Sequence, residues 1–113
     1  MLINGIVAHL IADWIFQNDW MARNKASLRH PAAWVHSGIH LLAMLFVFPL
    51  WAAVLIAVIH MFIDTRKPVQ FWQRIFRQTT TGSVGLTVSI WVDQVFHITV
   101  ITIVVLIIKF SAR

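Results

Sequence analysis

Long apolar stretches alternate with short polar segments along the chain. The apolar stretches cover about residues 2–17, 32–48, 50–64 and 83–108. A helix needs roughly 20 predominantly apolar residues to cross the hydrocarbon core of a bilayer, and these stretches approach or exceed that length. The pattern therefore predicts the all-α class: a polytopic membrane four-helix bundle that forms a single integral membrane domain over residues 1–113.

Pro49 separates the second and third apolar stretches. Proline removes a backbone donor and ends or kinks a helix. An unbroken helix over residues 32–64 would be about 50 Å long, well beyond a hydrocarbon core of roughly 30 Å. We therefore expect a turn at Pro49 between two short helices. The alternative is one kinked helix, which would leave three spans rather than four.

The composition of the chain is also typical of a membrane protein. Of its 113 residues, 59% are apolar and 12% are charged, whereas a soluble domain usually has about 25% charged residues. The net charge is +5, but the sequence has no motif of a nucleic-acid-binding module that combines aromatic and basic residues. We therefore expect membrane lipid, and not nucleic acid, as a partner. Cysteine is absent, which excludes disulfides, thiolate metal ligands and cysteine nucleophiles.

The two longer connections, at about residues 18–31 and 65–82, are basic. They hold Arg23, Lys25, Arg29, Arg66, Lys67, Arg74 and Arg77, whereas the opposite side of the predicted bundle holds Lys109 and Arg113. Basic loops of membrane proteins stay on the cytoplasmic side. We therefore expect the bacterial inner membrane as the location, with both loops cytoplasmic and both termini outside.

Each of these loops also has an amphipathic pattern. The apolar residues are Trp20, Met21 and Leu28 in the first loop and Val69, Trp72, Ile75 and Phe76 in the second, with basic residues between them. A short helix with one apolar and one basic face lies in the headgroup layer. We therefore predict a short interfacial amphipathic helix in each cytoplasmic loop. Solvated loops held by interfacial Trp anchors are the alternative.

Polar residues inside the apolar stretches occur in pairs at one spacing. Each predicted helix has one pair four residues apart: His9 and Asp13, His36 and His40, His60 and Asp64, Asp93 and His97. Side chains at this spacing project from the same face of a helix, and random placement of the His and Asp residues would give roughly one such pair. Because each ionisable side chain costs about 2.5–3.5 kcal/mol at the centre of a bilayer, the pairs need partners, water or a metal.

The predicted topology brings most of these pairs to one depth. The first three pairs lie at the cytoplasmic ends of their helices. The pair Asp93 and His97 lies about 15 Å along its helix if that helix begins at Ser83. A helix start nearer Gly85, or a loop that dips inward, would bring this pair closer to the others.

Imidazoles and carboxylates without sulfur are a ligand set for divalent transition metals. We expect one or two ions, with zinc as the first choice and iron or manganese as alternatives. The predicted metal ligands are His9, Asp13, His36, His40, His60, Asp64, Asp93 and His97. The three carboxylates, Asp13, Asp64 and Asp93, are also the predicted catalytic groups, because a carboxylate that binds no metal can act as a general base. The alternative is a set of buried hydrogen-bonded pairs that hold the helices together.

The chain resembles a small bacterial and phage membrane family, domain of unknown function 3307, in four segments. These are HLIADWIFQNDWMARNK at residues 9–25, HSGIH at 36–40, HMFIDTRK at 60–67 and DQVFH at 93–97. The resemblance implies a polytopic membrane protein whose polar signature adds Gln17, Lys25, Lys67 and Gln94 to the His and Asp residues. We expect these four residues to bind substrate. The resemblance implies no particular activity.

A looser similarity joins the chain to small bacterial membrane proteins described as metal-dependent hydrolases, although it lacks their Pro-Asp-x-Asp segment. The predicted function is therefore a membrane metalloprotein with its site near the cytoplasmic face, acting as a metal-dependent hydrolase on a lipid or other amphiphile. One alternative is a metal-ion transporter or sensor. The other is a non-catalytic, phage-type membrane protein whose His and Asp pairs assemble helices. Four short helices bury little surface, so we also expect a homodimer.

Overall fold

The protein is helical throughout the part of the chain that its computed structural model describes, residues 1–112. In chain order the elements are α1 (Leu2–Leu10), the π-helical segment η1 (Ile11–Ile15), α2 (Asp19–Asn24), α3 (Pro31–Leu45), α4 (Leu50–Asp64), α5 (Lys67–Ile75) and α6 (Gly82–Ser111). Residues 1–112 contain no strand, so the predicted all-α class is confirmed.

Each of the three prolines marks the start of a helix. Pro31 is the first residue of α3, Pro49 directly precedes α4, and Pro68 lies in the first turn of α5. Proline suits these positions because the first backbone N–H groups of a helix have no partner within it. The turn expected at Pro49 is confirmed, because residues 46–49 join α3 to α4 outside any helix. The kinked single helix is therefore excluded.

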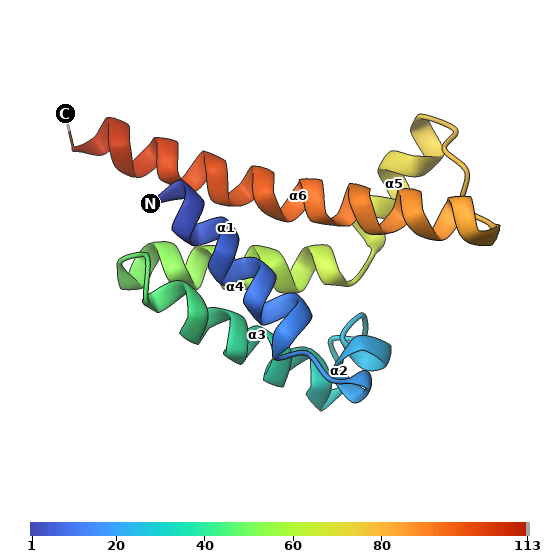
Figure 1. Ribbon diagram of the computed structural model, residues 1–113, viewed down its shortest axis with the longest axis horizontal. Coiled ribbons are helices and arrows are strands. Elements are labelled where there is room, and N and C mark those ends of the chain that lie inside the picture. The colour runs from blue at the N-terminus through green and yellow to red at the C-terminus, as the bar shows by residue number, and fades with distance from the viewer. Residues whose placement is uncertain (113) are drawn as a thin grey trace.

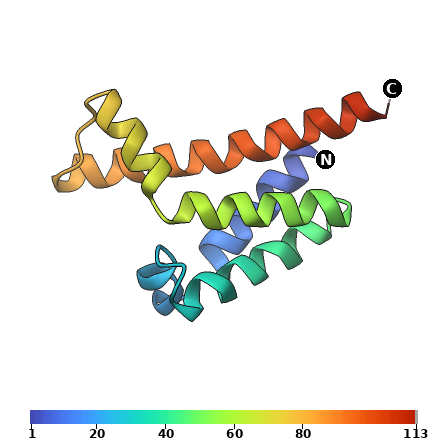
Figure 2. The ribbon, with the colours of Figure 1, turned by 180° about the vertical axis from the view of Figure 1, so that it is seen from behind.

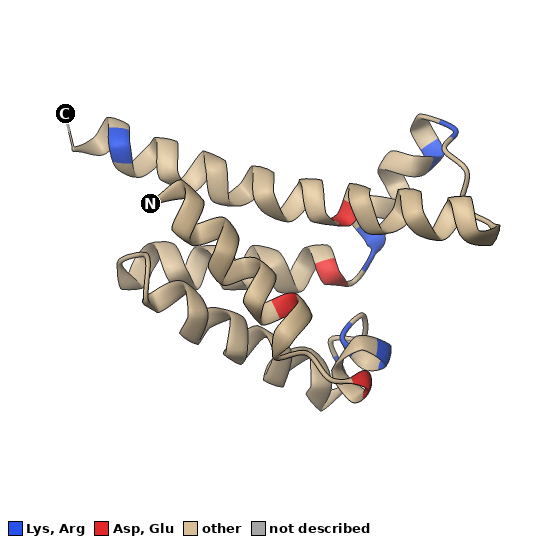
Figure 3. Cartoon of the chain, viewed as in Figure 1, with Lys and Arg blue, Asp and Glu red and all other residues tan. Residues whose placement is uncertain are grey.

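The basic residues are concentrated at one end of the helical bundle. α3 and α4 form a hairpin, α6 packs along α4, and α1 crosses between α3 and α6. The α3–α4 turn, the N-terminus and the C-terminal end of α6 lie at one end, and α2 and α5 lie at the other (Figures 1 and 2). Lys and Arg gather around α2, α5 and the adjoining turns, with one more near the C-terminal end of α6 (Figure 3). The basic loops therefore share one end; the compartment they face stays a prediction.

Helix length separates α6 from the others. α6 has 30 residues and contains an 18-residue stretch of mean hydropathy 2.1, so it is the one helix within residues 1–112 long and apolar enough to cross a membrane. α3 and α4 have 15 residues each, and α1 with η1 ends at Ile15. Helices of that size are about 22 Å long, less than a hydrocarbon core of roughly 30 Å. Helix length therefore supports one full membrane span, that of α6, and not the four predicted from the sequence.

Two regions fill the interior. The apolar core consists of Met44, Phe48, Ala52, Ala53, Ile56, Ile101 and Val104 and lies toward the α3–α4 turn. The polar cluster consists of His9, Asp13, His36, His40, His60, Asp64, Asp93 and His97 and lies toward α2 and α5. Gly5 lies where α1 meets the apolar core, and a Cβ atom there would lie 2.8 Å from the Phe48 ring. α1 can pack this closely because glycine has no side chain.

Both basic loops contain the short helix that their patterns predict, but the buried faces differ from the predicted ones. On α2 the side chain of Met21 is buried, whereas Leu28 lies after the helix, in the turn before α3. On α5 the buried residues are Val69 and Gln73, and the side chains of Trp72, Ile75 and Phe76 are exposed. α5 therefore packs on α4 and α6 through a partly polar face and turns its aromatic face outward.

Candidate metal centre

Four helical segments bring the polar cluster together from distant parts of the chain. η1 follows α1 without a break and supplies Asp13 beside His9; α3 supplies two imidazoles, α4 a His and an Asp, and α6 the remaining pair. Seven of the eight side chains are buried, and that of Asp93 is 21% exposed. Figure 3 shows the acidic positions of η1, α4 and α6 close to the same level of the molecule. The convergence expected from the topology is therefore present.

Asp13 of η1 connects four helices. Its Oδ1 lies 3.0 Å from Nε2 of His36 and 3.6 Å from Nε2 of His60. Its Oδ2 lies 3.6 Å from Nε2 of His9 and accepts a hydrogen bond of 3.2 Å from Nε2 of Gln94. One carboxylate thus contacts polar groups from α1, α3, α4 and α6.

Asp64 occupies a matching position on α4. Its Oδ2 lies 3.0 Å from Nε2 of His60 and 3.3 Å from Nε2 of His36. Its Oδ1 lies 3.2 Å from Nε2 of His97 and 3.7 Å from Nζ of Lys25, which follows α2. Lys25 is therefore the cation nearest to this buried carboxylate and offsets part of its charge.

The imidazoles also contact one another directly. Nδ1 of His9 lies 2.8 Å from Nε2 of His40, and the rings of His40 and His60 stack with centroids 3.6 Å apart. Nitrogens of His60 lie 3.0 Å from one nitrogen of His36 and 3.0 Å from one of His97. In each of these contacts one neutral ring nitrogen must donate and the other accept. Imidazole nitrogens that converge in this way can serve as ligands of a shared cation.

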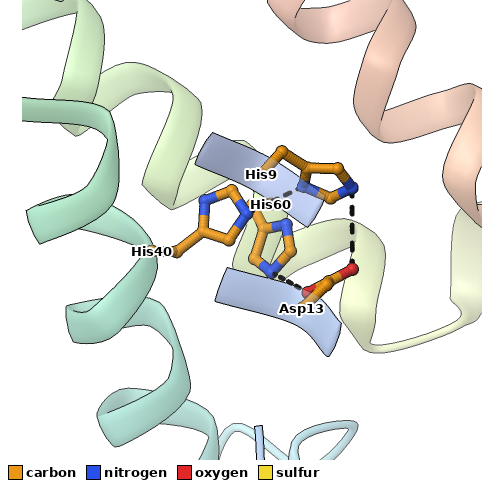
Figure 4. Close-up of side chains that lie close together, drawn as sticks. All are labelled: His9, Asp13, His40 and His60. Carbon is orange, nitrogen blue, oxygen red and sulfur yellow. Dashed lines mark hydrogen bonds and ion pairs between the residues drawn. The ribbon is translucent and has the colours of Figure 1, made fainter. Parts of the chain in front are cut away.

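The donor atoms form three groups that fit a metal ion. The groups are His9, Asp13, His40 and His60; His36, His60 and Asp64; and Asp13, Asp93 and His97. Within each group, one ligand atom from every residue lies within 4.8 Å of the others. Figure 4 shows the first group, whose side chains converge from α1–η1, α3 and α4. Three or four nitrogen and oxygen ligands are the usual number at zinc sites. Buried clusters of His and Asp that could hold a metal are therefore present, in a chain that lacks cysteine.

The groups only partly follow the pairs seen in the sequence. Three pairs stay together: His9 with Asp13, His60 with Asp64, and Asp93 with His97. His36 and His40 fall into different groups although they share a helix face, and their ring centroids are 6.2 Å apart. Helix spacing therefore places residues on a face, but contacts across helices decide which of them share a site.

The pair on α6 reaches the cluster in a way that the sequence did not predict. α6 begins at Gly82, not nearer Gly85, and its first turns extend past the ends of α3 and α4 (Figure 1). α5 folds back against this extension. Asp93 and His97 lie well inside α6 and still reach the other pairs, because α6 begins beyond the ends of its neighbouring helices.

Gln94 links the imidazoles to the carboxylates. Its Oε1 accepts a hydrogen bond of 2.8 Å from Nε2 of His9, and its Nε2 donates to Asp13 and, at 3.3 Å, to Asp93. The amide thus holds one ring orientation of His9, in the way that residues around metal ligands commonly do. Sequence reasoning expected Gln94 to bind substrate, and this stays a prediction; in the structure Gln94 forms hydrogen bonds with the polar cluster.

A cleft of about 310 Å³ opens beside the polar cluster at the α2 and α5 end. The carboxylates of Asp13, Asp64 and Asp93 line it, and none of the five imidazoles does. Gln17, Lys25 and Gln94 also line it, as three of the four predicted substrate-binding residues, whereas Lys67 is exposed on α5 outside the lining. The carboxylates therefore stand between the cleft and the buried imidazoles.

Several cleft residues were missed by sequence reasoning. Gln73 is buried, lines the cleft and donates a hydrogen bond of 2.9 Å to Oγ of Ser89 on α6. Gln70 lines the cleft from the same helix. The spacing of Gln73 four residues after the buried Val69 was the available signal, but the stronger apolar pattern of Trp72 and Phe76 hid it.

A protein-family model matches the whole chain. The family is described as "Protein of unknown function (DUF3307)", its model matches residues 1–113, and the chain belongs to this family. The resemblance seen in the sequence is therefore confirmed. No curated protein and no solved structure gave a significant match.

Proposed function

We propose that this member of the DUF3307 family is an integral membrane metalloprotein that binds one or two divalent transition-metal ions and hydrolyses a lipid or other amphiphile. One observation carries the proposal: buried imidazoles form the inner part of the cluster, and three carboxylates separate them from an open cleft. An ion held between the two layers would face the cleft, as a catalytic metal with an open coordination position does. A purely structural site has no need of such access.

The surface of the helices supports a membrane location. Large apolar side chains are exposed on α1, α3, α4 and α6, for example Ile3, Trp34, Leu50 and Ile103. Exposed apolar surface on this scale is costly in water and favourable in lipid. The basic end with α2 and α5 then faces the cytoplasm, and the termini lie outside. Helices too short for the full hydrocarbon core can be accommodated by local thinning of the bilayer.

The ligand set also bears on the identity of the metal. Imidazole suits zinc and iron, and carboxylate suits manganese and other hard ions. We place zinc first because it accepts mixed nitrogen and oxygen ligands in tetrahedral sites. When bound, the metal would acidify a coordinated water and polarise the scissile carbonyl or phosphoryl group.

The carboxylates divide into two roles. Asp13 and Asp64 are buried and each contacts at least two imidazoles, so they act as ligands. Asp93 is the most exposed of the three and lines the cleft, so it acts as the general base that takes a proton from the attacking water. Gln94 holds both Asp93 and His9 and is a positioning residue.

The same geometry bears on the two alternative functions, metal transport and helix assembly. Transport needs a polar path beyond the site, but the apolar core fills the interior on the side away from the cleft. Helix assembly has specific support, because imidazoles and carboxylates from different helices contact one another directly, at 2.8–3.3 Å. It is the second candidate, and metal content separates it from the first.

The test combines elemental analysis of the detergent-purified protein with turnover of two chromogenic amphiphiles, a long-chain p-nitrophenyl ester and an alkyl p-nitrophenyl phosphodiester. Wild type should contain one or two equivalents of metal. His9→Ala should lose metal and turnover together. Asp93→Asn should keep metal and lose turnover, because it removes the base and leaves the buried ligands in place.

The control is Lys109→Ala, at the end of α6 away from the cluster, which should keep both properties. Absence of metal after purification in metal-replete buffer, with every variant still helical and monodisperse, would leave helix assembly as the role of the cluster. Metal without turnover of either compound in wild type would reject hydrolysis of these two ester classes.

A further inference from the structure

The cleft is lined by two cationic side chains, of which one has a carboxylate partner and the other has none among residues 1–112. Lys25 lies 3.7 Å from the carboxylate of Asp64 and is already partly neutralised. Arg66 lines the same cleft, and within residues 1–112 it forms no ion pair. Arg66 lies in the tight turn between α4 and α5, where its backbone has a left-handed φ of 67°. The turn thus places Arg66, whose side chain is exposed, at a cleft that leads to the polar cluster.

Neutral hydrogen-bonding groups line the same cleft as this cation. The side chains of Gln17, Gln70 and Gln73 line the cleft, and Gln73 is held in place by its bond to Ser89. The Oε1 atom of Gln17 is buried and accepts no hydrogen bond from residues 1–112. Several amides and one guanidinium in a single cleft suit a ligand that has several acceptor oxygens and at least one hydroxyl donor. A phosphate ester of a polyol has both.

Apolar side chains also line the cleft. They are Trp14 of η1 and Leu86 and Ile90 of α6. All three are exposed, and Leu86 is 61% exposed. The cleft therefore has an exposed apolar border, which continues onto the surface of η1 and α6.

We propose, on the basis of the function proposed above, that the cleft binds the head of a phosphate-bearing amphiphile and that its apolar chain leaves along the exposed apolar border of η1 and α6. Arg66 contacts the phosphate, and Trp14, Leu86 and Ile90 contact the first part of the chain. A volume of about 310 Å³ is at the lower limit for ligand sites, so the cleft holds a head and not a whole lipid. The chain must then remain in the surrounding bilayer.

Binding can be measured apart from metal chemistry. The protein is treated with EDTA in a neutral detergent and titrated by calorimetry with three probes: dihexanoyl phosphatidic acid, glycerol 3-phosphate and dihexanoylglycerol. The first probe has head and chains, the second the head alone, and the third the chains alone. We expect phosphatidic acid to bind at least about tenfold more tightly than either partial probe.

Two pairs of matched variants locate the contacts. Arg66→Gln should weaken phosphatidic acid and glycerol 3-phosphate by about tenfold, the effect of one charge-assisted contact. Lys67→Gln removes the neighbouring charge outside the cleft lining and should change binding less than about twofold. Leu86→Ser should weaken phosphatidic acid alone, whereas Val84→Ser, at an equally exposed site of α6 outside the lining, should not.

The contrary results are distinct. Equal losses in Arg66→Gln and Lys67→Gln would mean nonspecific attraction of anions to the basic end and would overturn the assignment. Equal affinity for glycerol 3-phosphate and phosphatidic acid would mean a site for soluble phosphate esters, without a role for the exposed apolar border. Metal content and turnover of the same variants keep the two proposals apart. Metal and turnover without phosphatidic acid binding would reject the cleft assignment alone. The expected binding pattern without metal would reject the hydrolase alone.

Discussion

The apolar core and the polar cluster are built on the same faces of the same helices. On α3 the buried positions run from His36 and His40 to Met44. On α4 they run in the opposite sense, from Ile56 to His60 and Asp64. Buried residues of one helix thus change from polar to apolar along its length, at constant helical spacing. Helical periodicity decides which face is buried, and the residue types along that face decide which of the two regions it joins.

The two regions depend on different physics. The apolar core is stabilised by dispersion and close packing, which tolerate some change of shape. The polar cluster consists of groups that are costly to bury unless each has a partner or a metal. A substitution in the apolar core should therefore affect stability first, and one in the polar cluster should affect metal binding first.

The largest effect is expected for His60→Ala. His60 belongs to two of the three ligand groups and contacts both buried carboxylates. Metal content measured by elemental analysis should fall at least about tenfold, because ligands are lost from two groups at once. The matched control is His30→Asn, which changes the one histidine outside the polar cluster and keeps a side chain able to cap α3. Equal metal content in the two variants would contradict the metal centre.

The apolar core should give the opposite result. Met44→Ala removes a fully buried side chain and should lower the free energy of unfolding in detergent by about 2–5 kcal/mol, measured by thermal unfolding with circular dichroism. Folded protein should keep its metal. Leu42→Ala, at an exposed position of the same helix, should cost much less. A loss of metal from folded Met44→Ala would show that the apolar core and the polar cluster are coupled and do not respond separately to substitution.

Gln94→Leu tests the group that connects ligands to carboxylates. The substitution removes the acceptor of His9 and the donor to Asp13 while keeping a side chain of similar size. Loss of such supporting hydrogen bonds lowers metal affinity by roughly 10–100-fold, which competition with a chromogenic chelator can measure. Gln70→Leu, in the cleft but without a bond to the cluster, is the control. Unchanged affinity in Gln94→Leu would leave this residue as a cleft residue only.

The smallest effect is expected outside both regions. Asn18 caps α2, and its side chain accepts a hydrogen bond of 2.9 Å from the backbone N–H of Met21. Asn18→Ala should lower the free energy of unfolding by about 1 kcal/mol or less, and Asn18→Ser should restore it. Metal content should stay the same in both variants. A loss of metal in Asn18→Ala would mean that α2 helps to hold the polar cluster.

Local rules were sufficient for much of the fold. The predicted stretch at residues 50–64 coincides with α4, and the stretch at 32–48 corresponds to α3, which begins one residue earlier and ends at Leu45. The predicted and observed limits are close because proline and apolar periodicity act within a few residues. The eight ligand candidates were found by their spacing alone, since only a helix makes a separation of four residues meaningful. Helix lengths were less well predicted: α6 extends from Gly82 to Ser111, past both limits expected for it.

The sequence by itself determined the helices, the turn at Pro49 and the set of polar residues that must be buried together. Only the tertiary structure decided that Asp13 contacts His36, that His36 and His40 belong to different ligand groups, and that Arg66 rather than Lys67 lines the cleft. The physical reason is the distance along the chain over which each interaction acts. Periodicity and capping act between neighbours in the chain, whereas the register of one helix against another depends on the packing of side chains from segments that are far apart in sequence.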